Sequence, residues 1–149
     1  MSNGRKVLLA ADHAGYSLKE DLEAHLLDLG YEPVDLGTDS TDSVDYPDFG
    51  ARVANGIREG RADCGVLVCG AGIGMAMVAN RQPGVRAANC LTEQMASLAR
   101  EHNDANVLCL GSRLLAAADA KKILWKFLET PFGGGRHERR VEKIEQLVS

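Results

Sequence analysis

Short, continuous apolar runs alternate along this chain with stretches of helical periodicity. The apolar runs predict buried strands at 6–11, 32–36, 65–69, 85–90 and 107–110. Between them, apolar residues recur every three or four positions, which predicts helices over about 17–29, 47–59, 75–80, 92–101 and 116–128, and a last helix after the glycines at 133–135. Such alternation is typical of a parallel sheet with helices on both faces.

Several helix boundaries carry local signals. Ser17 and Glu20 have the spacing of a capping box at the start of the first helix, and Gly30 is a natural stop at the end of that helix. Pro47 suits the first position of the second helix. The last helix is expected to carry Val141, Ile144, Leu147 and Val148 on one face.

Ligands of parallel sheets bind at the carboxyl ends of the strands, so the loops after residues 11, 36, 69, 90 and 111 are the places to look for chemistry. Polar and glycine-rich motifs follow these strands, and we expect them all at or near that edge. They are Asp12-His13-Ala-Gly15, Asp45-Tyr46-Pro47, Cys69-Gly-Ala-Gly-Ile-Gly74, His102-Asn103-Asp104 and Gly111-Ser-Arg113.

The 149 residues fit one domain with a real core, since 45% are hydrophobic and 26% charged. Seventeen basic and 21 acidic residues give a net charge of −4, which argues against a nucleic-acid partner. No apolar run approaches the length of a membrane helix. The apolar stretch at 7–11 is too short for a signal peptide, so we expect no membrane partner, a cytoplasmic address and reduced cysteines.

Cys69 stands directly before the glycine-rich loop 70–74. The loop lacks both the full dinucleotide fingerprint and the Lys-Ser/Thr pair of a P-loop, so it is either a tight turn or an anion-binding loop. Cys69 is likewise either a small core residue or a thiol whose position favours the thiolate and lets it act as a base. Cys64, Cys90 and Cys109 are interpreted as core residues.

Two further clusters allow more than one interpretation. Asp12 and His13 could form a metal pair, a sugar-hydroxyl clamp or a capping turn, and the lack of a third ligand favours hydrogen bonding over metal. Arg136 and Arg140 lie one helical turn apart, near His137 and Arg139. They form either a solvated basic face or a fork for the phosphate of a small ligand, which we favour in an acidic protein.

Taken together, the motifs resemble those of the type B ribose-5-phosphate isomerases, a group that includes allose-6-phosphate isomerases and galactose-6-phosphate isomerase subunits. The resemblance rests on the five motifs above together with Gly135-Arg136-His137…Arg140, and it covers essentially the whole chain, in order. It implies one sugar-phosphate isomerase domain over 1–149, with a Rossmann-like three-layer α/β fold and a five-stranded parallel sheet. It also implies aldose–ketose isomerisation without metal or other cofactor, in a homodimer or homotetramer.

The resemblance also assigns roles to residues. Cys69 matches the base that moves a proton from C2 to C1 through a cis-enediolate, and His102 matches the residue that opens the sugar ring. The remaining matches are substrate contacts: the backbone of Gly70, Ala71, Gly72, Ile73 and Gly74 around the enediolate oxygen, Asp12 and His13 on sugar and phosphate, Tyr46 and Asn103 lining the pocket, and Arg113, Arg136 and Arg140 on the phosphate. It further implies that His102, Asn103 and Arg113 face a neighbouring subunit's Cys69, and that the C-terminal helix packs on that neighbour.

Ala71 departs from the family, because many relatives carry a hydroxyl there. Isomerisation of ribose 5-phosphate to ribulose 5-phosphate is the leading hypothesis. The same chemistry on allose or galactose 6-phosphate is the nearest alternative. A non-catalytic sugar-phosphate-binding subunit is a third reading, and a redox role of Cys64 and Cys69 is a distant fourth.

Overall fold

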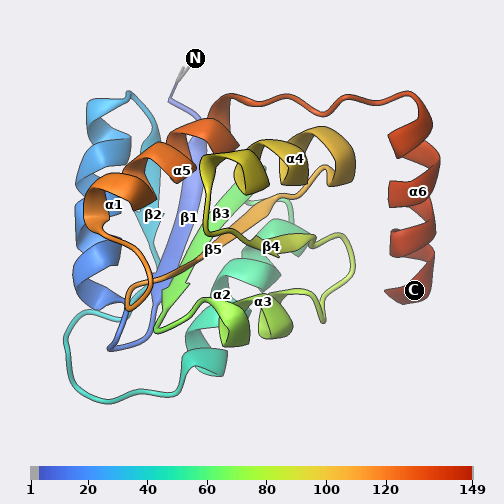
Figure 1. Ribbon diagram of the computed structural model, residues 1–149. Coiled ribbons are helices and arrows are strands. Elements are labelled where there is room, and N and C mark those ends of the chain that lie inside the picture. The colour runs from blue at the N-terminus through green and yellow to red at the C-terminus, as the bar shows by residue number, and fades with distance from the viewer. Residues whose placement is uncertain (1–3, 149) are drawn as a thin grey trace.

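A five-stranded, all-parallel sheet forms the centre of the computed structural model, which describes residues 4–148 (Figure 1). The strand order is β2-β1-β3-β5-β4. The strands are β1 (Lys6–Ala11), β2 (Glu32–Asp35), β3 (Cys64–Cys69), β4 (Ala87–Asn89) and β5 (Val107–Gly111). Cys69 pairs in register with Gly111, so the loops after β3 and β5 leave the sheet side by side.

Helices cover both faces of the sheet, which confirms the predicted three layers. They are α1 (Tyr16–Asp28), α2 (Tyr46–Arg58), α3 (Ile73–Ala79), α4 (Glu93–Asn103), α5 (Ala117–Glu129) and α6 (Arg136–Glu145), with a 3-10 turn at Gln146–Val148. In Figure 1, α1, α4 and α5 lie on one face and α2 and α3 on the other, and each set packs its own hydrophobic cluster against the strands. None of the helices in the described range has the length and apolar character needed to span a bilayer.

The central strands are buried on both faces, as their continuous apolar sequences predict. Val7 and Leu9 of β1 join the cluster under α1, α4 and α5, whereas Leu8 joins the cluster under α2 and α3. The same alternation in β3 sends Cys64 to the first cluster and Cys69 to the second. The cysteine before the glycine loop therefore lies on the side of the sheet that α3 covers.

The predicted capping box is wrong. Helix α1 begins at Tyr16 with Gly15 as its N-cap and no side-chain cap, so Ser17 lies inside the first turn. The Asp12 carboxylate accepts a hydrogen bond from Gly15 N–H at 3.0 Å and organises this start. Glu20 instead pairs with Lys19, and the distance from Lys19 Nζ to Glu20 Oε2 is 2.9 Å.

Two other elements, β4 and the final helix, are shorter than predicted. β4 covers only Ala87–Asn89 of the expected strand 85–90. The final helix ends at Glu145, and a 3-10 turn covers Gln146–Val148. Of the four apolar residues expected on that face only Val141 is buried, and Leu147 is 83% exposed.

Candidate active site

The loops after β1, β3 and β5 are tied to one another at the carboxyl edge of the sheet. Asp12 N–H donates to the Val68 carbonyl at 3.2 Å, and Ser112 N–H donates to the Cys69 carbonyl at 2.9 Å. The Ser112 hydroxyl also donates to the Ala14 carbonyl at 2.8 Å, which joins the first loop to the last. These bonds fix the frame around Cys69 within a single chain.

Cys69 ends β3 with its thiol turned into the glycine loop. Its Sγ accepts a hydrogen bond from Gly72 N–H at 3.2 Å, and the residue is 6% exposed. Gly72 has φ +82°, and a Cβ there would lie 2.7 Å from Asn89 Oδ1 and 2.9 Å from the Leu110 carbonyl carbon. Only glycine fits this conformation and space, so the turn that delivers an N–H to the sulfur depends on it.

Tyr46 and Arg113 flank the same loop. A Cβ on Gly74 would lie 2.5 Å from the Tyr46 ring, and one on Gly70 would lie 2.7 Å from Arg113 Nη1. Arg113 N–H also donates to the Gly70 carbonyl at 2.9 Å. The expectation that Arg113 faces a neighbour's Cys69 is therefore corrected, because the register of β3 and β5 puts Arg113 on its own chain's loop.

Asp12 and His13 complete this edge. Asp12 is buried, with Oδ1 held by Gly15 N–H. His13 Nδ1 accepts a hydrogen bond from Val44 N–H at 3.1 Å, which ties the loop before α2 to the first loop. With Nδ1 accepting, the ring proton of a neutral imidazole is on Nε2, which is then the nitrogen free to donate to a ligand.

His102 and Asn103 do not lie at this edge, contrary to the sequence expectation. They end α4, which runs back across the sheet, and Asp104 then bonds to Arg86, just before β4 begins. The six residues of β3 separate the two edges by about 16 Å of strand. In a parallel fold only the start of a helix adjoins a strand's carboxyl end, so residues at the end of α4 return to the amino edge.

The predicted arginines of the C-terminal helix join His102 at this second place. The His102 and His137 rings stack with centroids 4.4 Å apart and an interplanar angle of 17°. Arg136 and Arg140 flank His137 along α6, and both are exposed. Asn103 helps to line an apolar cavity of about 440 Å³ between α6, β4 and α4.

Helix α6 stands apart from the layered body and is joined to it by an extended segment (Figure 1). Near its end, Glu145 accepts from Gly84 N–H at 2.8 Å and pairs with Arg86. Arg86 also reaches Asp104, at 3.4 Å, and Asp104 pairs with Arg100 at 2.9 Å. One ion-pair chain thus connects the arginine helix to the end of the helix that carries His102.

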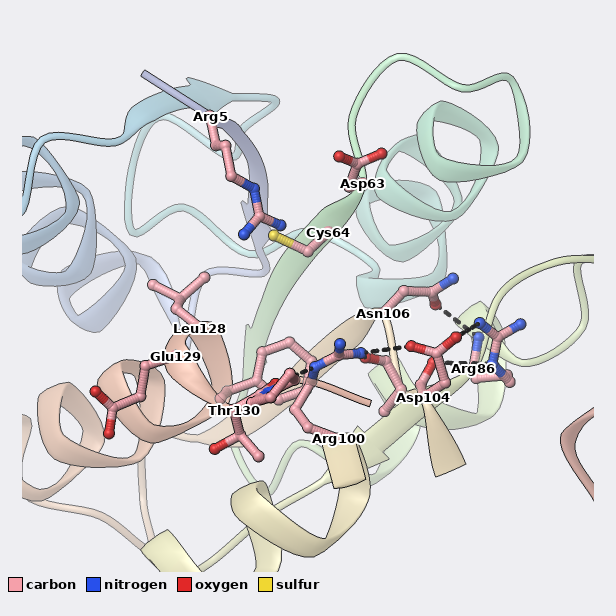
Figure 2. Close-up of a pocket in the computed structure, with 13 residues that line it drawn as sticks. Arg5, Asp63, Cys64, Arg86, Arg100, Asp104, Asn106, Leu128, Glu129 and Thr130 are labelled. Carbon is pink, nitrogen blue, oxygen red and sulfur yellow. Dashed lines mark hydrogen bonds and ion pairs between the residues drawn. The ribbon is translucent and has the colours of Figure 1, made fainter. Parts of the chain in front are cut away.

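A cavity of about 420 Å³ opens at the amino edge (Figure 2). Arg5, which precedes β1, and Cys64, the first residue of β3, face Arg100 and Asp104 across it. This cavity lies at the opposite end of the sheet from Cys69, and its basic and acidic side chains balance. None of the predicted site residues lines this cavity.

The cysteines separate into two kinds. Burial raises the pKa of both Cys64 and Cys90 to about 11, and it raises the pKa of Cys109 further. All four thiols are free and buried. Cys69 differs from Cys64, Cys90 and Cys109 in standing against the backbone donor of the glycine loop.

One acidic cluster in the described range, formed by Glu20, Glu23 and Asp35, brings carboxylate oxygens within 4.8 Å of one another. Lys19 Nζ lies 2.7 Å from Asp35 and 2.9 Å from Glu20. The Lys19 ammonium thus already pairs with the carboxylates that a metal cation would need.

Sequence reasoning assigned no role to three residues that the structure places in these groups. Ser112 joins two loops, and His137 stacks on His102. Asn89 turns a buried Oδ1 with no hydrogen-bond partner toward Gly72. A polar residue inside a predicted buried strand was the available signal for Asn89, and neighbouring motif residues were the signal for the other two.

Comparison with known proteins gives one consistent result. The profile of the ribose/galactose isomerase family matches residues 7–144. Ribose-5-phosphate isomerase B of Escherichia coli K12 is 41% identical over 143 residues, which are 96% of either chain. A ribose 5-phosphate isomerase of Thermotoga maritima superposes with a TM-score of 0.93 at 51% identity, over 95% of this chain and 98% of that one.

A further structure adds a ligand to the comparison. Ribose-5-phosphate isomerase B of Mycoplasma genitalium, solved with bound ribulose 5-phosphate, has a TM-score of 0.92 and 42% identity, with 95% of each chain covered.

Proposed function

This chain belongs to the ribose/galactose isomerase family, and we propose that it interconverts ribose 5-phosphate and ribulose 5-phosphate with Cys69 as the base. Two relatives carry the substrate assignment: the Escherichia coli enzyme by its name and the Mycoplasma genitalium enzyme by its bound ribulose 5-phosphate. The hydrogen bond from Gly72 N–H to Cys69 Sγ carries the assignment of the base, because an N–H donor is the partner that a thiolate requires.

The proton transfer needs a base, a stabilised oxyanion and little water. Cys69 is buried at the mouth of the glycine loop, so a substrate carbon beside Sγ also lies against loop backbone. Cys69 removes the C2 proton and returns it to C1, while backbone N–H groups of residues 70–74 stabilise the enediolate oxygen. Ala71 offers no hydroxyl to move the proton between the two oxygens, so that transfer uses Asp12 or a water molecule.

The phosphate and the ring-opening acid require a second copy of the chain. His102, Arg136 and Arg140 form one group at the amino edge, about 16 Å of strand away from Cys69 in the same chain. A neighbouring subunit brings these three residues to the Cys69 edge, where Arg113 and His13 already stand. The active site of this proposal is shared between two subunits of a homodimer, or of a homotetramer built from such dimers.

Exposed apolar side chains support such an assembly. Ile73 and Met77, one turn apart on α3, are 51% and 67% exposed. Leu91, Met95 and Leu98, where α4 begins, are also exposed. These two groups flank the short edge strand β4, and an edge strand left open invites pairing or cover. The packing of α6 on the neighbour and the cytoplasmic address both remain predictions.

The test is conversion of ribose 5-phosphate to ribulose 5-phosphate by the purified protein in excess EDTA. We expect turnover in EDTA, loss of at least about 1,000-fold in Cys69→Ala, and a Kd for ribose 5-phosphate that Cys69→Ala leaves nearly unchanged. Cys64→Ala is the matched control, since it removes an equally buried thiol from the other end of β3.

Two outcomes would overturn the proposal. A folded protein that binds ribose 5-phosphate without turnover would be a binding subunit or an isomerase of another sugar phosphate. Equal losses in Cys69→Ala and Cys64→Ala would remove the base assignment.

A further inference from the structure

The ring of His137 lies against the face of the His102 ring. The two rings stack with a centroid distance of 4.4 Å and are nearly parallel, at 17°. The side chain of His102 is otherwise open, with 40% of it exposed and Glu101 Oε1 3.6 Å from its Nε2. An exposed imidazole at a helix end has several rotamers, and a stacked neighbour removes most of them.

The backbone sets this stack. Gly133 N–H donates to the Glu101 carbonyl at 2.9 Å, which returns the chain to the end of α4 just before α6 begins. His137 N–H then donates to the Gly134 carbonyl at 3.0 Å, in the first turn of the helix. His137 therefore reaches His102 through a fixed connection, and Arg136 and Arg140 are carried on the same helix.

The surroundings of His137 disfavour a proton on its ring. Loss of water, followed by the positive charge of His102, Arg136 and Arg140, lowers the pKa of His137, with Glu101 opposing. A neutral His137 stacks on His102 without repelling a proton on it.

We propose that His137 is a positioning residue, which orients His102 for opening the furanose ring of the aldose substrate. The inference rests on the proposed function. In ring opening the bond between C1 and the ring oxygen breaks, the ring oxygen gains a proton, and the C1 hydroxyl loses one as the aldehyde forms. His102 exchanges these protons, and its ring must face the sugar for both transfers.

The two directions of the reaction separate this role from others. Ribose 5-phosphate is mostly a closed furanose, whereas ribulose 5-phosphate has its C5 hydroxyl esterified and stays open. We expect His137→Ala to lower kcat for ribose 5-phosphate about 10-fold while changing kcat for ribulose 5-phosphate less than about 2-fold. His137→Phe keeps an aromatic face against His102, and we expect it to recover most of the loss.

The remaining outcomes overturn the inference. Equal losses in both directions would mean a role in phosphate binding or in the placement of α6, as would a KM increase without change in kcat. If His137→Ala leaves kcat for ribose 5-phosphate unchanged, or if His137→Phe is as slow as His137→Ala, the ring stack has no role in ring opening. Conversion of ribulose 5-phosphate by the unmodified protein tests the proposed function separately, because that direction does not require ring opening.

Discussion

Strand β3 carries a cysteine at each end, and the two are equally buried at 6% exposure. At the amino end, burial raises the pKa of Cys64 to about 11, so this thiol stays protonated near neutral pH. At the carboxyl end, Cys69 Sγ accepts an N–H from the glycine loop. Residue type and exposure are the same at both ends. The two ends differ in the backbone around the sulfur, since Gly72 N–H donates a hydrogen bond to Cys69 Sγ.

The two edges also differ in how they are held. The carboxyl edge is joined by backbone hydrogen bonds between loops that follow different strands, such as Ser112 N–H to the Cys69 carbonyl. At the amino edge, one backbone hydrogen bond, from Gly133 N–H to the Glu101 carbonyl, holds the chain just before α6, and the other attachments involve side chains: Glu145, buried Val141 and the His102–His137 stack. One chain thus fixes the geometry around the proposed base. The arginine helix is more loosely attached, and we infer that assembly completes its placement.

The largest effect expected from this division is rescue between two inactive variants. Cys69→Ala disables one edge and His102→Asn the other, so each alone should fail to convert ribose 5-phosphate. If the site is shared, mixed dimers contain one site with both residues intact. Random exchange in a dimer should restore about a quarter of wild-type activity, since half the dimers are mixed and each has one good site of two.

Co-expression with two different affinity tags supplies the mixed species, and native mass spectrometry counts them. Mixed dimers that form yet stay inactive would place the whole site within one chain. The geometry of α4 would then require a rearrangement, since His102 stands at the far edge from Cys69.

Selective alkylation probes the two ends of β3 directly. At pH 8 a thiol with a pKa of about 11 is thiolate in only about one molecule in a thousand, so Cys64 should react very slowly with iodoacetamide. We expect Cys69 to react at least about 100-fold faster and to be protected by ribose 5-phosphate. Peptide mass spectrometry distinguishes the two sites. Labelling of Cys64 should rise only as the pH approaches 11, and equal labelling at pH 8 would erase the distinction.

Replacing one glycine of positive φ at each edge shows how much each edge contributes to the free energy of unfolding. Gly72 has φ +82° and no room for a Cβ, whereas Gly134, before α6, has φ +65° and no atom within 4 Å of a Cβ. We expect Gly72→Ala to lower the free energy of unfolding by roughly 2–4 kcal/mol and to abolish turnover, and Gly134→Ala to cost only roughly 1 kcal/mol. Urea denaturation and kcat/KM check both, and similar losses would show that the edges are equally constrained.

The sheet, its covering helices and the loops around Cys69 could be predicted from sequence, because periodicity and strand ends are local features. The wrong capping box shows the limit of that approach. Ser17 and Glu20 satisfy the pattern, but Asp12 bonds to Gly15 N–H from the preceding loop and starts the helix earlier.

The placement of His102 could not be predicted from its motif alone. The motif after the fourth strand and its helix was expected at or near the carboxyl edge of the sheet, but the direction of α4 takes His102 away from Cys69 of the same chain. Arg113 shows the opposite error, since the register of β5 on β3 brings it to Gly70 of its own chain. Both errors concern distances across the sheet, which topology sets and local sequence does not encode.

The smallest expected effect comes from the attachment of α6. Glu145 bonds to Gly84 N–H and pairs with Arg86, which in turn reaches Asp104 beside His102. Glu145→Gln keeps an acceptor for Gly84 but removes the charge opposite Arg86, and a partly exposed pair of this kind is worth about 1 kcal/mol. We therefore expect KM for ribose 5-phosphate to rise about 3- to 10-fold with kcat nearly unchanged, because Arg136 and Arg140 move while Cys69 does not. Glu142→Gln, an exposed change on the same helix, should leave KM where it is. A fall in kcat instead would mean that α6 positions the reacting groups as well as the phosphate, and the mechanical separation of the two edges would then fail.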